Sequence, residues 1–331
     1  MKKGKLGLLV SAAALILLLG GCGTKAADTK SSTQETAKTE KTSAAKDEVK
    51  AGTKIKVKDG EGKEVEVPAK PSKVVVFDMG SLDTINELGG KNTVVGAPTK
   101  TMPNYLKEYK SVESAGGIKE PDFEKINAMK PELIIISGRQ RDAKEMLEKI
   151  APTLYLGVDA AKTWESTKQN IKTLGTIYGK EAEADKKISE LDKKIADLHK
   201  RATDSQLTGL VTLVNEGSLS AYGNGSRFGI VYDTFGVKPA DDTIKASTHG
   251  QEISYEYVLE KNPDILYVVD RTKAIGGDTS KNNVADNELV KQTKAGKTNK
   301  VISLTPDVWY LAGGGIESTN IMIDDVSKGF K

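Results

Sequence analysis

Residues 181–202, EAEADKKISELDKKIADLHKRA, predict one long amphipathic helix near the middle of the chain. Apolar residues recur there at alternating steps of four and three, which lines one face of a helix and suits no strand. These residues are Ala184, Ile188, Leu191, Ile195, Leu198 and Ala202. Acidic residues open the stretch and basic residues close it, in agreement with a helix dipole. At about 1.5 Å per residue, the helix extends roughly 33 Å, about the width of a small domain.

Two similar units of sequence lie on either side of this helix. The first is PDFEKINAMKPELIIISGRQ, at residues 121–140, and the second is SYEYVLEKNPDILYVVDR, at residues 254–271. Each unit predicts a short helix, a proline that ends it, and a buried strand that stops at an arginine. The register agrees without gaps, because the glutamate of each first turn precedes the proline by seven positions and the arginine by fifteen.

Strands and helices alternate in both halves of the chain, which predicts an α/β fold. We expect two Rossmann-like lobes with mainly parallel sheets, joined by one long helix. A cleft between the lobes would hold the ligand, because ligands of open α/β sheets bind outside the carboxyl ends of the strands. The expected segments are an N-terminal lobe at 53–180, a linker helix at 181–203 and a C-terminal lobe at 204–331. Within the first, IKVKDGEGKEVEVP at 55–68 predicts a hairpin with a Gly-rich turn.

The start of the chain predicts export. MKKGKLG is a basic segment, LLVSAAALILLL is an apolar segment too short and too early for a spanning helix, and LGGC follows. We therefore expect a signal peptide at residues 1–21. Residues 23–52 are mostly Thr, Ser, Ala, Lys, Glu and Asp with no aromatic residue, so they bury too little apolar surface to fold. We expect a flexible tether at 22–52.

The composition excludes several classes of function. The chain has 49 basic and 46 acidic residues, and the excess of three falls within residues 1–21. No basic stripe remains for nucleic acid. The single cysteine, Cys22, excludes an internal disulfide framework and a cysteine metal cluster. Two histidines, His199 and His249, are too few for a site of several imidazoles.

Motifs of hydrolases and nucleotide-binding proteins are absent from the sequence. There is no G-x-S-x-G elbow, no H-E-x-x-H helix and no paired-cysteine motif. The glycines of residues 222–229, YGNGSRFG, are spaced one position too long for the dinucleotide fingerprint. We predict a binding protein with no catalytic residues, not an enzyme, and no resident cofactor. An exported hydrolase is the alternative from another class.

Arginine is scarce in this chain, so its positions are informative. The five arginines among 49 basic residues are Arg139, Arg141, Arg201, Arg227 and Arg271. A guanidinium group is planar, binds anionic oxygens through paired hydrogen bonds and stays protonated. Arg139 and Arg271 end the strands of the repeated units, and Arg227 lies in the Gly-rich stretch. We predict that these three converge on a ligand with several negative oxygens. The alternative is that each pairs with a surface carboxylate.

This layout resembles the iron-siderophore-binding lipoproteins of ABC importers, which have two α/β lobes and one linker helix. The resemblance covers roughly residues 53–331 and is strongest to the branch that binds ferric catecholates of the petrobactin type. In that branch three cleft arginines bind the catecholate oxygens, and SGRQ, GSRFG and VVDR match their motifs at Arg139, Arg227 and Arg271. Haem or cobalamin in the same fold is the alternative ligand, but neither has so many clustered anionic oxygens.

The resemblance also implies two residues that contact iron. Related members complete the coordination of iron with one histidine and one tyrosine when the siderophore fills only four sites. HGQEIS and WYLAGG place His249 and Tyr310 at these positions. We therefore expect both residues in the ligand site, with direct Fe(III) ligation only for tetradentate siderophores.

The remaining expectations concern location and partners. LGGC resembles a bacterial lipoprotein processing box, which implies cleavage before Cys22 and lipidation of its thiol with palmitate. We expect a monomer anchored at the outer face of the cytoplasmic membrane, in a Gram-positive envelope. The family docks on its permease, which works with an ATPase, through one surface glutamate per lobe. By motif these are Glu124 and Glu256. A glutamate in a first turn also stabilises its helix, by about 0.3–1 kcal/mol.

Overall fold

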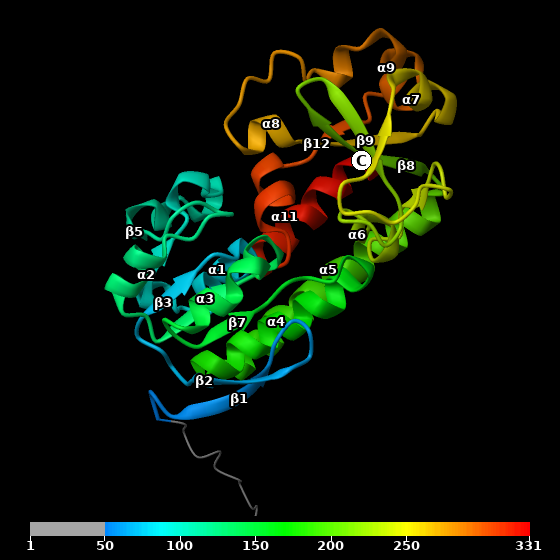
Figure 1. The fold of residues 1–331 in the computed structure, drawn as a ribbon. Helices are drawn as coiled ribbons and strands as arrows, with labels where there is room; N and C mark the ends of the chain where they lie inside the picture. The colour runs from blue at the N-terminus through cyan, green and yellow to red at the C-terminus, as the bar shows by residue number, and fades with distance from the viewer. Residues whose placement is uncertain (1–49) are drawn as a thin grey trace, which may run out of the picture. The chain divides into compact units, whose positions relative to one another are not determined.

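The computed structural model describes residues 50–331. Within them the chain forms two α/β lobes joined by one long helix, α5 (Figure 1). The fold class predicted from the sequence is confirmed. The predicted signal peptide, most of the predicted tether and Cys22 lie outside the described residues.

The N-terminal lobe is built on a five-stranded parallel sheet of order β5-β4-β3-β6-β7. Its strands are β3 (Val74–Val76), β4 (Val94–Ala97), β5 (Glu113–Ser114), β6 (Leu133–Ile136) and β7 (Thr153–Tyr155). Its helices are α1 (Met79–Glu87), α2 (Phe123–Met129), α3 (Lys144–Glu148) and α4 (Thr163–Tyr178). The central strands are apolar throughout because both faces are covered: Val74 and Val76 pack into one core, Val75 into another.

The predicted hairpin is confirmed. Strands β1 (Lys54–Lys58) and β2 (Glu64–Pro68) pair antiparallel, from Lys54 opposite Pro68 to Lys58 opposite Glu64. The buried Asp59 shapes the turn, since one of its carboxylate oxygens accepts from the backbone N–H groups of Glu61 and Lys63.

The C-terminal lobe has a mixed sheet of order β11-β9-β8-β12-β13, with β10 also paired to β8. Strand β8 is parallel to β10 and β12, as β12 is to β13, whereas β8–β9 and β9–β11 are antiparallel. The strands are β8 (Thr208–Asn215), β9 (Ser218–Tyr222), β10 (Lys238–Pro239), β11 (Gln251–Ile253), β12 (Ile265–Asp270) and β13 (Val301–Ser303). The helices are α6 (Ile230–Asp233), α7 (Tyr255–Lys261), α8 (Arg271–Ala274), α9 (Glu288–Gln292), α10 (Lys294–Lys297) and α11 (Ile316–Ser327).

The two repeated units of sequence fold alike. Each begins with a helix, α2 or α7, whose N-cap side chain accepts a backbone N–H of the first turn. Each helix ends at a residue in the left-handed conformation, Lys130 (φ 50°) or Asn262 (φ 43°), directly before the proline. The central strand, β6 or β12, follows at once.

A carboxylate at the same register position ties each unit to its neighbouring strand. Glu132 accepts from the backbone N–H and the hydroxyl of Ser72, at 2.7 and 2.9 Å. Asp264 accepts from the same two groups of Thr208, at 2.9 and 2.8 Å. Since Ser72 precedes β3 and Thr208 begins β8, both contacts fix the start of a central strand.

Helix α5 spans Glu181–Ser205 and runs alongside α4 from the N-terminal lobe to the C-terminal lobe (Figure 1). Its buried face consists of the six apolar residues predicted from the spacing. The helix is held against α4 by packing and by a hydrogen bond of 2.7 Å from the Trp164 indole nitrogen to Asp192.

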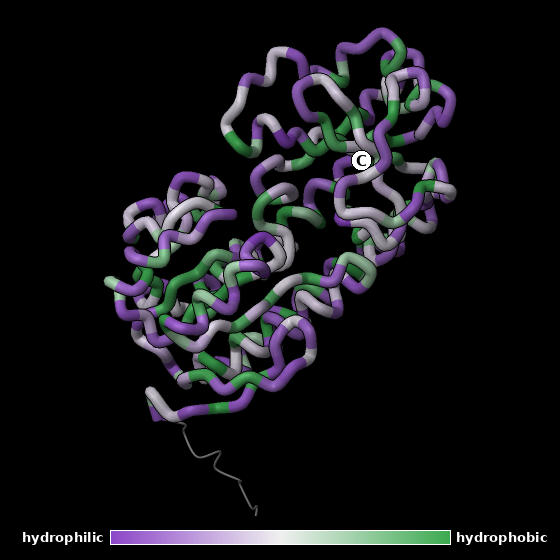
Figure 2. Tube along the Cα trace, viewed as in Figure 1, coloured by the Kyte–Doolittle hydropathy of each residue, from purple (hydrophilic) through white to green (hydrophobic). Residues whose placement is uncertain are grey.

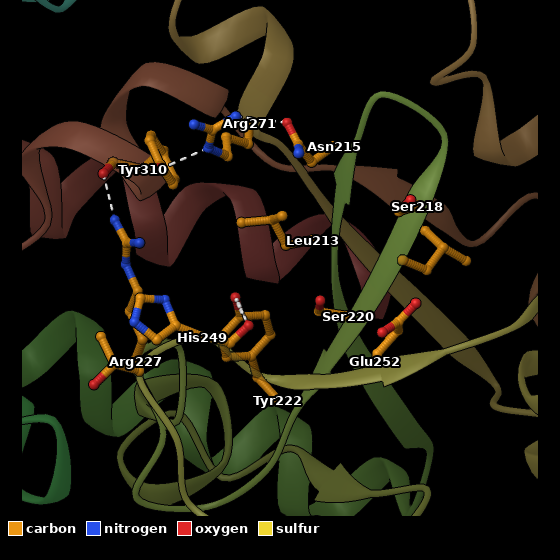
Figure 3. A pocket seen from close by; sticks show the side chains of 12 residues that line it. Leu213, Asn215, Ser218, Ser220, Tyr222, Arg227, His249, Glu252, Arg271 and Tyr310 are labelled. Atoms are coloured by element: carbon orange, nitrogen blue, oxygen red, sulfur yellow. Dashed lines mark hydrogen bonds between the residues drawn. The ribbon is translucent and has the colours of Figure 1, made fainter.

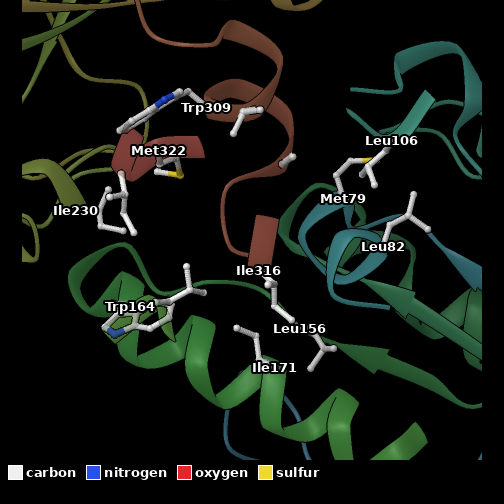
Figure 4. Packing of buried hydrophobic residues seen from close by; sticks show 14 of the residues in the cluster. Met79, Leu82, Leu106, Leu156, Trp164, Ile171, Ile230, Trp309, Ile316 and Met322 are labelled. Atoms are coloured by element: carbon white, nitrogen blue, oxygen red, sulfur yellow. The ribbon is translucent and has the colours of Figure 1, made fainter. Parts of the chain in front are cut away.

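Helix α11 provides a second connection between the lobes. Its first backbone N–H groups, those of Glu317 and Ser318, donate to the carboxylate of Asp83 in α1, at 3.0 and 2.7 Å. The backbone of Gly314 lies so close to Gly80 that a Cβ on Gly80 would stand 2.9 Å from the Gly314 carbonyl carbon. The lobes also share one hydrophobic cluster, which continues from the N-terminal sheet through α5 and α11 into the C-terminal lobe (Figure 4). In Figure 2 the hydrophobic residues gather along strands in both lobes, and hydrophobic and hydrophilic residues alternate along the helices.

Candidate ligand-binding site

The three predicted arginines meet at one residue, Tyr310. Its backbone carbonyl accepts hydrogen bonds from the Nη2 atoms of Arg139 and Arg227, both at 2.6 Å. Its hydroxyl accepts from Nε of Arg271 at 2.9 Å. Tyr310 lies in a π-helical turn, Val308–Ala312, an uncommon backbone form that is frequent at functional sites.

Arg139 reaches this point from the N-terminal lobe. It follows β6 in a short 3₁₀ helix, Gly138–Ala143, whose N-cap is Ser137. The backbone N–H of Ser137 donates to the Gln140 side chain, which fixes the turn that aims the arginine. Burial lowers the pKa of Arg139 from its ordinary value, and the positive charge of Arg227 lowers it further. The two guanidinium groups are thus close enough to repel.

Arg227 and Arg271 come from the C-terminal lobe. The Arg227 guanidinium lies over the Tyr310 ring, 4.4 Å from its centre, and 5.2 Å from the centre of the Phe228 ring. Arg271 begins α8, directly after β12, and its Nη1 donates to the Asn215 side chain at 2.6 Å. These contacts hold both side chains in place, but the partners are neutral groups and leave the positive charges of the arginines uncompensated.

None of these three arginines forms an ion pair with a carboxylate within residues 50–331. Arg141, two positions after Arg139, does so: its Nη1 lies 2.9 Å from a carboxylate oxygen of Glu61. The alternative of surface ion pairs thus fits Arg141 and fails for the other three. Three like charges held together without a counter-ion make this region suited to an anion.

A cavity of about 390 Å³ opens beside Tyr310 in the C-terminal lobe (Figure 3). Its floor is one face of the antiparallel strands β8, β9 and β11, where residues directly opposite each other project to the same side. Both Arg227 and Arg271 line the cavity. The other lining residues are Leu213, Asn215, Ser218, Leu219, Ser220, Tyr222, Thr248, His249, Glu252 and Tyr310.

His249 lies on the rim of this cavity, in an exposed position. Its backbone carbonyl accepts from the hydroxyl of Tyr222 at 3.0 Å. The next residue, Gly250, has φ 78°, and a Cβ there would stand 2.8 Å from the Tyr222 ring, so only glycine fits this turn. No group of three or more His, Cys, Asp and Glu side chains in the described part of the chain is arranged to hold a metal ion.

The hydroxyl of Tyr310 is acidified by its surroundings. Burial acts to raise its pKa, but the hydrogen bond from Arg271 and the charges of Arg271 and Arg227 outweigh burial. The pKa of Tyr310 is therefore lowered from its ordinary value. A phenol in this environment gives up its proton more readily than a free one.

The model of the periplasmic binding protein family matches residues 74–308. The petrobactin-binding protein YclQ of Bacillus subtilis is 46% identical over 267 residues, which cover 80% of this chain and 84% of YclQ. Its crystal structure superposes with a TM-score of 0.82, over 84% of this chain and 99% of that one. This chain belongs to the periplasmic binding protein family.

Two further relatives support the same membership. The ferric-anguibactin-binding protein FatB of Vibrio anguillarum is 35% identical over 274 residues, covering 79% of this chain and 83% of FatB. The siderophore-binding protein BauB, solved with two molecules of acinetobactin and ferric iron, is 34% identical with a TM-score of 0.77, over 84% of this chain and 99% of BauB. All three relatives are named as binding proteins and not as enzymes. As in this family generally, the present chain has an α/β fold with two lobes.

Three of the other predicted site residues of this periplasmic binding protein, Arg139, Glu124 and Glu256, do not line the cavity. Glu124 and Glu256 are exposed in the first turns of α2 and α7, one in each lobe. Cys22 lies outside the described residues. None of the helices within 50–331 is long and apolar enough to span a membrane.

The sequence reasoning missed the polar floor of the cavity, which Asn215, Ser218, Ser220 and Glu252 form. A signal was present: Glu-Gly at residues 216–217 is followed by SLSA at residues 218–221, in which polar and apolar residues alternate. Both turn residues have positive φ, 51° and 88°, as a two-residue hairpin turn requires. Because the preceding strand looked like part of a parallel sheet, we predicted no antiparallel partner for it.

Proposed function

We propose that this protein is a lipid-anchored receptor outside the cytoplasmic membrane that binds a ferric catecholate siderophore of the petrobactin type. It would deliver this complex to an ABC permease and its ATPase for iron uptake. The convergence of Arg139, Arg227 and Arg271 on Tyr310 without a carboxylate carries the proposal. The names of YclQ, FatB and BauB agree with a ferric siderophore as the ligand class.

Binding would consist of an exchange of acceptors. Two guanidinium groups share the single carbonyl oxygen of Tyr310. A ferric catecholate presents several anionic oxygens around one metal, and each accepts a charge-assisted hydrogen bond that is stronger than one to a neutral carbonyl. The arginines would turn from Tyr310 to these oxygens, and the repulsion between Arg139 and Arg227 would be relieved. Partial burial strengthens these contacts relative to water.

His249 and Tyr310 would coordinate iron directly when the siderophore supplies only four donor atoms. The lowered pKa of Tyr310 favours the phenolate, which is the form that binds a ferric ion. A neutral imidazole is a suitable second donor. A hexadentate siderophore leaves no open position on iron. Both residues would then contact the siderophore without ligating the metal.

Fluorescence titration with a panel of ferric siderophores tests the ligand class. Trp309 is buried next to Tyr310, and its ring packs edge-on against Phe228, with 6.2 Å between ring centres. Ferric catecholates should quench this tryptophan saturably. Quenching by haem, cobalamin or ferric hydroxamates, with no response to catecholates, would contradict the proposal. A turnover assay with ester and phosphate substrates should remain blank, because a binding protein catalyses neither reaction.

Replacing Arg227 with alanine tests the arginine cluster. A hydrogen bond to a charged group contributes about 1.5–3 kcal/mol, so Arg227→Ala should weaken catecholate binding about ten- to a hundredfold. The matched control is Arg201→Ala, since Arg201 lies on α5, donates to the Ser327 hydroxyl and lines no part of the cavity. Equal affinity in both variants would remove Arg227 from the site.

Anchoring and delivery belong to the same proposal. Cys22 would carry the lipid, and residues 22–52 would tether the lobes to the outer face of a Gram-positive membrane. Glu124 and Glu256 would meet arginines of the permease, one from each lobe. Their exposure in the first turns of the two equivalent helices supports this role. The receptor would act as a monomer without nucleic acid.

A further inference from the structure

The turn that carries Tyr310 is held by the N-terminal lobe at two points. At one point, Arg139 donates to the backbone carbonyls of Tyr310 and Leu311, at 2.6 and 3.4 Å. At the other, the backbone N–H of Asn104 donates to Oδ2 of Asp307 at 2.7 Å. Asp307 precedes Tyr310 by three residues and is the N-cap of the π-helical turn. The N-terminal lobe therefore contacts both the start and the middle of this turn.

Asn104 is a fixed donor in the N-terminal lobe. It begins the 3₁₀ helix Asn104–Ser111, whose Leu106 and Tyr109 side chains are buried in the main hydrophobic cluster. The preceding residue, Pro103, is buried as well, and its ring fixes its φ. The backbone N–H of Asn104 is thus presented to the C-terminal lobe by rigid structure, and its direction does not depend on a side-chain rotamer.

Asp307 lies in a segment that the C-terminal lobe holds. The buried Asp325 of α11 accepts from the backbone N–H of Thr305 at 2.7 Å and from the Trp309 indole nitrogen at 3.0 Å, on either side of Asp307. Oδ1 of Asp307 itself accepts from the backbone N–H of Val308 at 3.2 Å, which leaves Oδ2 for the N-terminal lobe. One carboxylate therefore joins the start of the turn to both lobes.

A ligand affects the two contacts with the N-terminal lobe differently. A ligand among the arginines takes Arg139 away from the turn. The Asp307 contact involves no arginine, and its two residues line a second cavity of about 230 Å³ instead of the cavity beside Tyr310. It can persist when the ligand is bound. A turn without this contact would be mobile in the free protein, and ordering it on binding would reduce the affinity.

We propose that Asp307 is a positioning residue, which holds the turn against the N-terminal lobe through the backbone N–H of Asn104 and so fixes Tyr310. The turn then keeps its place while the ligand takes over Arg139. This inference rests on the proposed function only where it assumes that exchange, because the contact itself exists without ligand. Asp307 touches neither the siderophore nor iron.

Two substitutions remove the same hydrogen bond from opposite lobes. Asp307→Ala removes the acceptor, and Asn104→Pro removes the donor. Proline suits this position, because the first residue of a helix tolerates it. Pro103 already has the extended conformation that a residue before proline adopts, with φ −57° and ψ 148°. The matched control is Asn104→Ala, which keeps the N–H group. Circular dichroism checks that each variant folds.

The first measurement is the titration of Tyr310 without ligand, followed by tyrosinate absorption as the difference from a matched Tyr310→Phe protein. Against the effect of burial, the hydrogen bond from Arg271 helps to lower the pKa of Tyr310, and this bond of 2.9 Å requires the turn in its place. In Asp307→Ala and Asn104→Pro the pKa should rise towards its ordinary value of about 10. The double variant should show no larger rise, because both changes remove one bond.

The second measurement is affinity for the iron(III) complex of a synthetic bis-catecholate. Asp307→Ala and Asn104→Pro should each bind it about three- to tenfold more weakly, the range for a partly exposed hydrogen bond to a charged group, and Asn104→Ala should bind as wild type does. If Asn104→Pro does not fold, amide exchange at residue 104 of Asp307→Ala replaces it. Faster exchange supports the contact, and unchanged protection overturns it.

Three results would overturn the positioning role of Asp307. One is an unchanged titration of Tyr310 in both variants. Another is a change in Asp307→Ala alone, since Asp307 would then act through Val308 and not through the N-terminal lobe. The third is unchanged affinity in both variants. If wild-type protein does not bind the complex while the titration shifts as expected, the proposed function fails and the positioning of Tyr310 stands.

Discussion

At the scale of single residues, Tyr310 organises the site because it offers two acceptors to three cations. Its carbonyl receives Arg139 and Arg227, and its hydroxyl receives Arg271. Lysine would not reproduce this arrangement, since an ammonium group has no planar fork to span a ring and a carbonyl together.

The lowered pKa of Tyr310 leads to a prediction about iron ligation. With the ferric complex of a tetradentate bis-catecholate, wild-type protein should change the visible absorption of the complex, because a phenolate joins the metal. Tyr310→Phe should abolish this change. In Arg271→Gln the change should appear only at higher pH, since the hydrogen bond and the charge that lower the pKa of Tyr310 are lost.

Two controls separate ligation from simple contact. A hexadentate tris-catecholate should give the same spectrum with wild-type protein and Tyr310→Phe. His249→Ala should alter the spectrum of the tetradentate complex without shifting its pH dependence. A spectrum that is unaffected by Tyr310→Phe would show that the tyrosine does not ligate iron.

Sequence reasoning was effective where a residue's position is fixed by its neighbours in the chain. Arg139 and Arg271 were predictable because each follows a buried strand at the same distance from a proline. Glu252 was not, because its place depends on pairing between β9 and β11, which are separated by 28 residues that include α6 and β10. A two-residue turn signals β8–β9, but no local pattern signals the return of β11.

At the scale of secondary structure, the junction of α1 and α11 depends on glycine. Gly80 is the second residue of α1, where alanine would ordinarily favour the helix by about 1 kcal/mol. Here a Cβ would stand 2.9 Å from the carbonyl carbon of Gly314 and 3.0 Å from its oxygen. Those are backbone atoms, so no rotamer change can relieve the contact.

We expect Gly80→Ala to destabilise the protein by about 1–3 kcal/mol, because overpacking outweighs the gain in helix propensity. Chemical denaturation measures the change. Gly117→Ala is the control, since a Cβ at Gly117 would meet nothing closer than 3.8 Å. A Gly80→Ala variant as stable as wild type would show that α1 and α11 can separate without loss.

At the scale of the whole described unit, the two lobes are connected by more than α5. The hydrophobic cluster that runs through α5 and α11 belongs to both lobes, and the α11 N-terminus is held by Asp83 of the N-terminal lobe. We expect only limited closure of the lobes on ligand binding, because one continuous helix between them resists a hinge. The position of α11 is a further reason for this expectation, and one that periodicity in the chain does not reveal.

Asp83 makes the stability of this connection depend on pH. Burial raises its pKa to about 7, although the hydrogen bonds from the backbone N–H groups of Ser318 and Glu317 oppose the rise. In the unfolded chain the carboxyl group titrates near its ordinary pKa of about 4. Between these values the folded state binds more protons than the unfolded state, so the free energy of unfolding falls as pH rises.

The expected loss between about pH 4 and pH 7 is up to about 4 kcal/mol, at roughly 1.4 kcal/mol per pKa unit. Asp83→Asn keeps the shape but does not titrate, so this part of the slope should disappear. The difference between the two proteins, measured by denaturation at several pH values, isolates Asp83 from other titrating groups. Parallel stability curves would contradict the assignment.

The equivalence of the two lobes gives a final prediction, about docking on the permease. Glu124 and Glu256 occupy the same position in α2 and α7, so they would engage two similar halves of a transporter. In cells that carry the transporter, replacing both with glutamine should strongly reduce siderophore uptake, while the affinity of the purified protein for its ligand stays unchanged. Each single replacement should have a smaller effect, because one contact remains.

A glutamate in a first turn also stabilises its helix, so docking must be separated from stability. Glu145 and Glu288 serve as controls, since each is exposed in the first turn of another helix, α3 in the N-terminal lobe and α9 in the C-terminal lobe. Replacing this pair with glutamine should lower the free energy of unfolding by a similar amount, about 0.3–1 kcal/mol per site, and leave uptake intact. If both pairs reduce uptake equally, loss of protein stability explains the effect and the docking role is wrong. If neither pair of replacements reduces uptake, the transporter recognises some other part of the lobes.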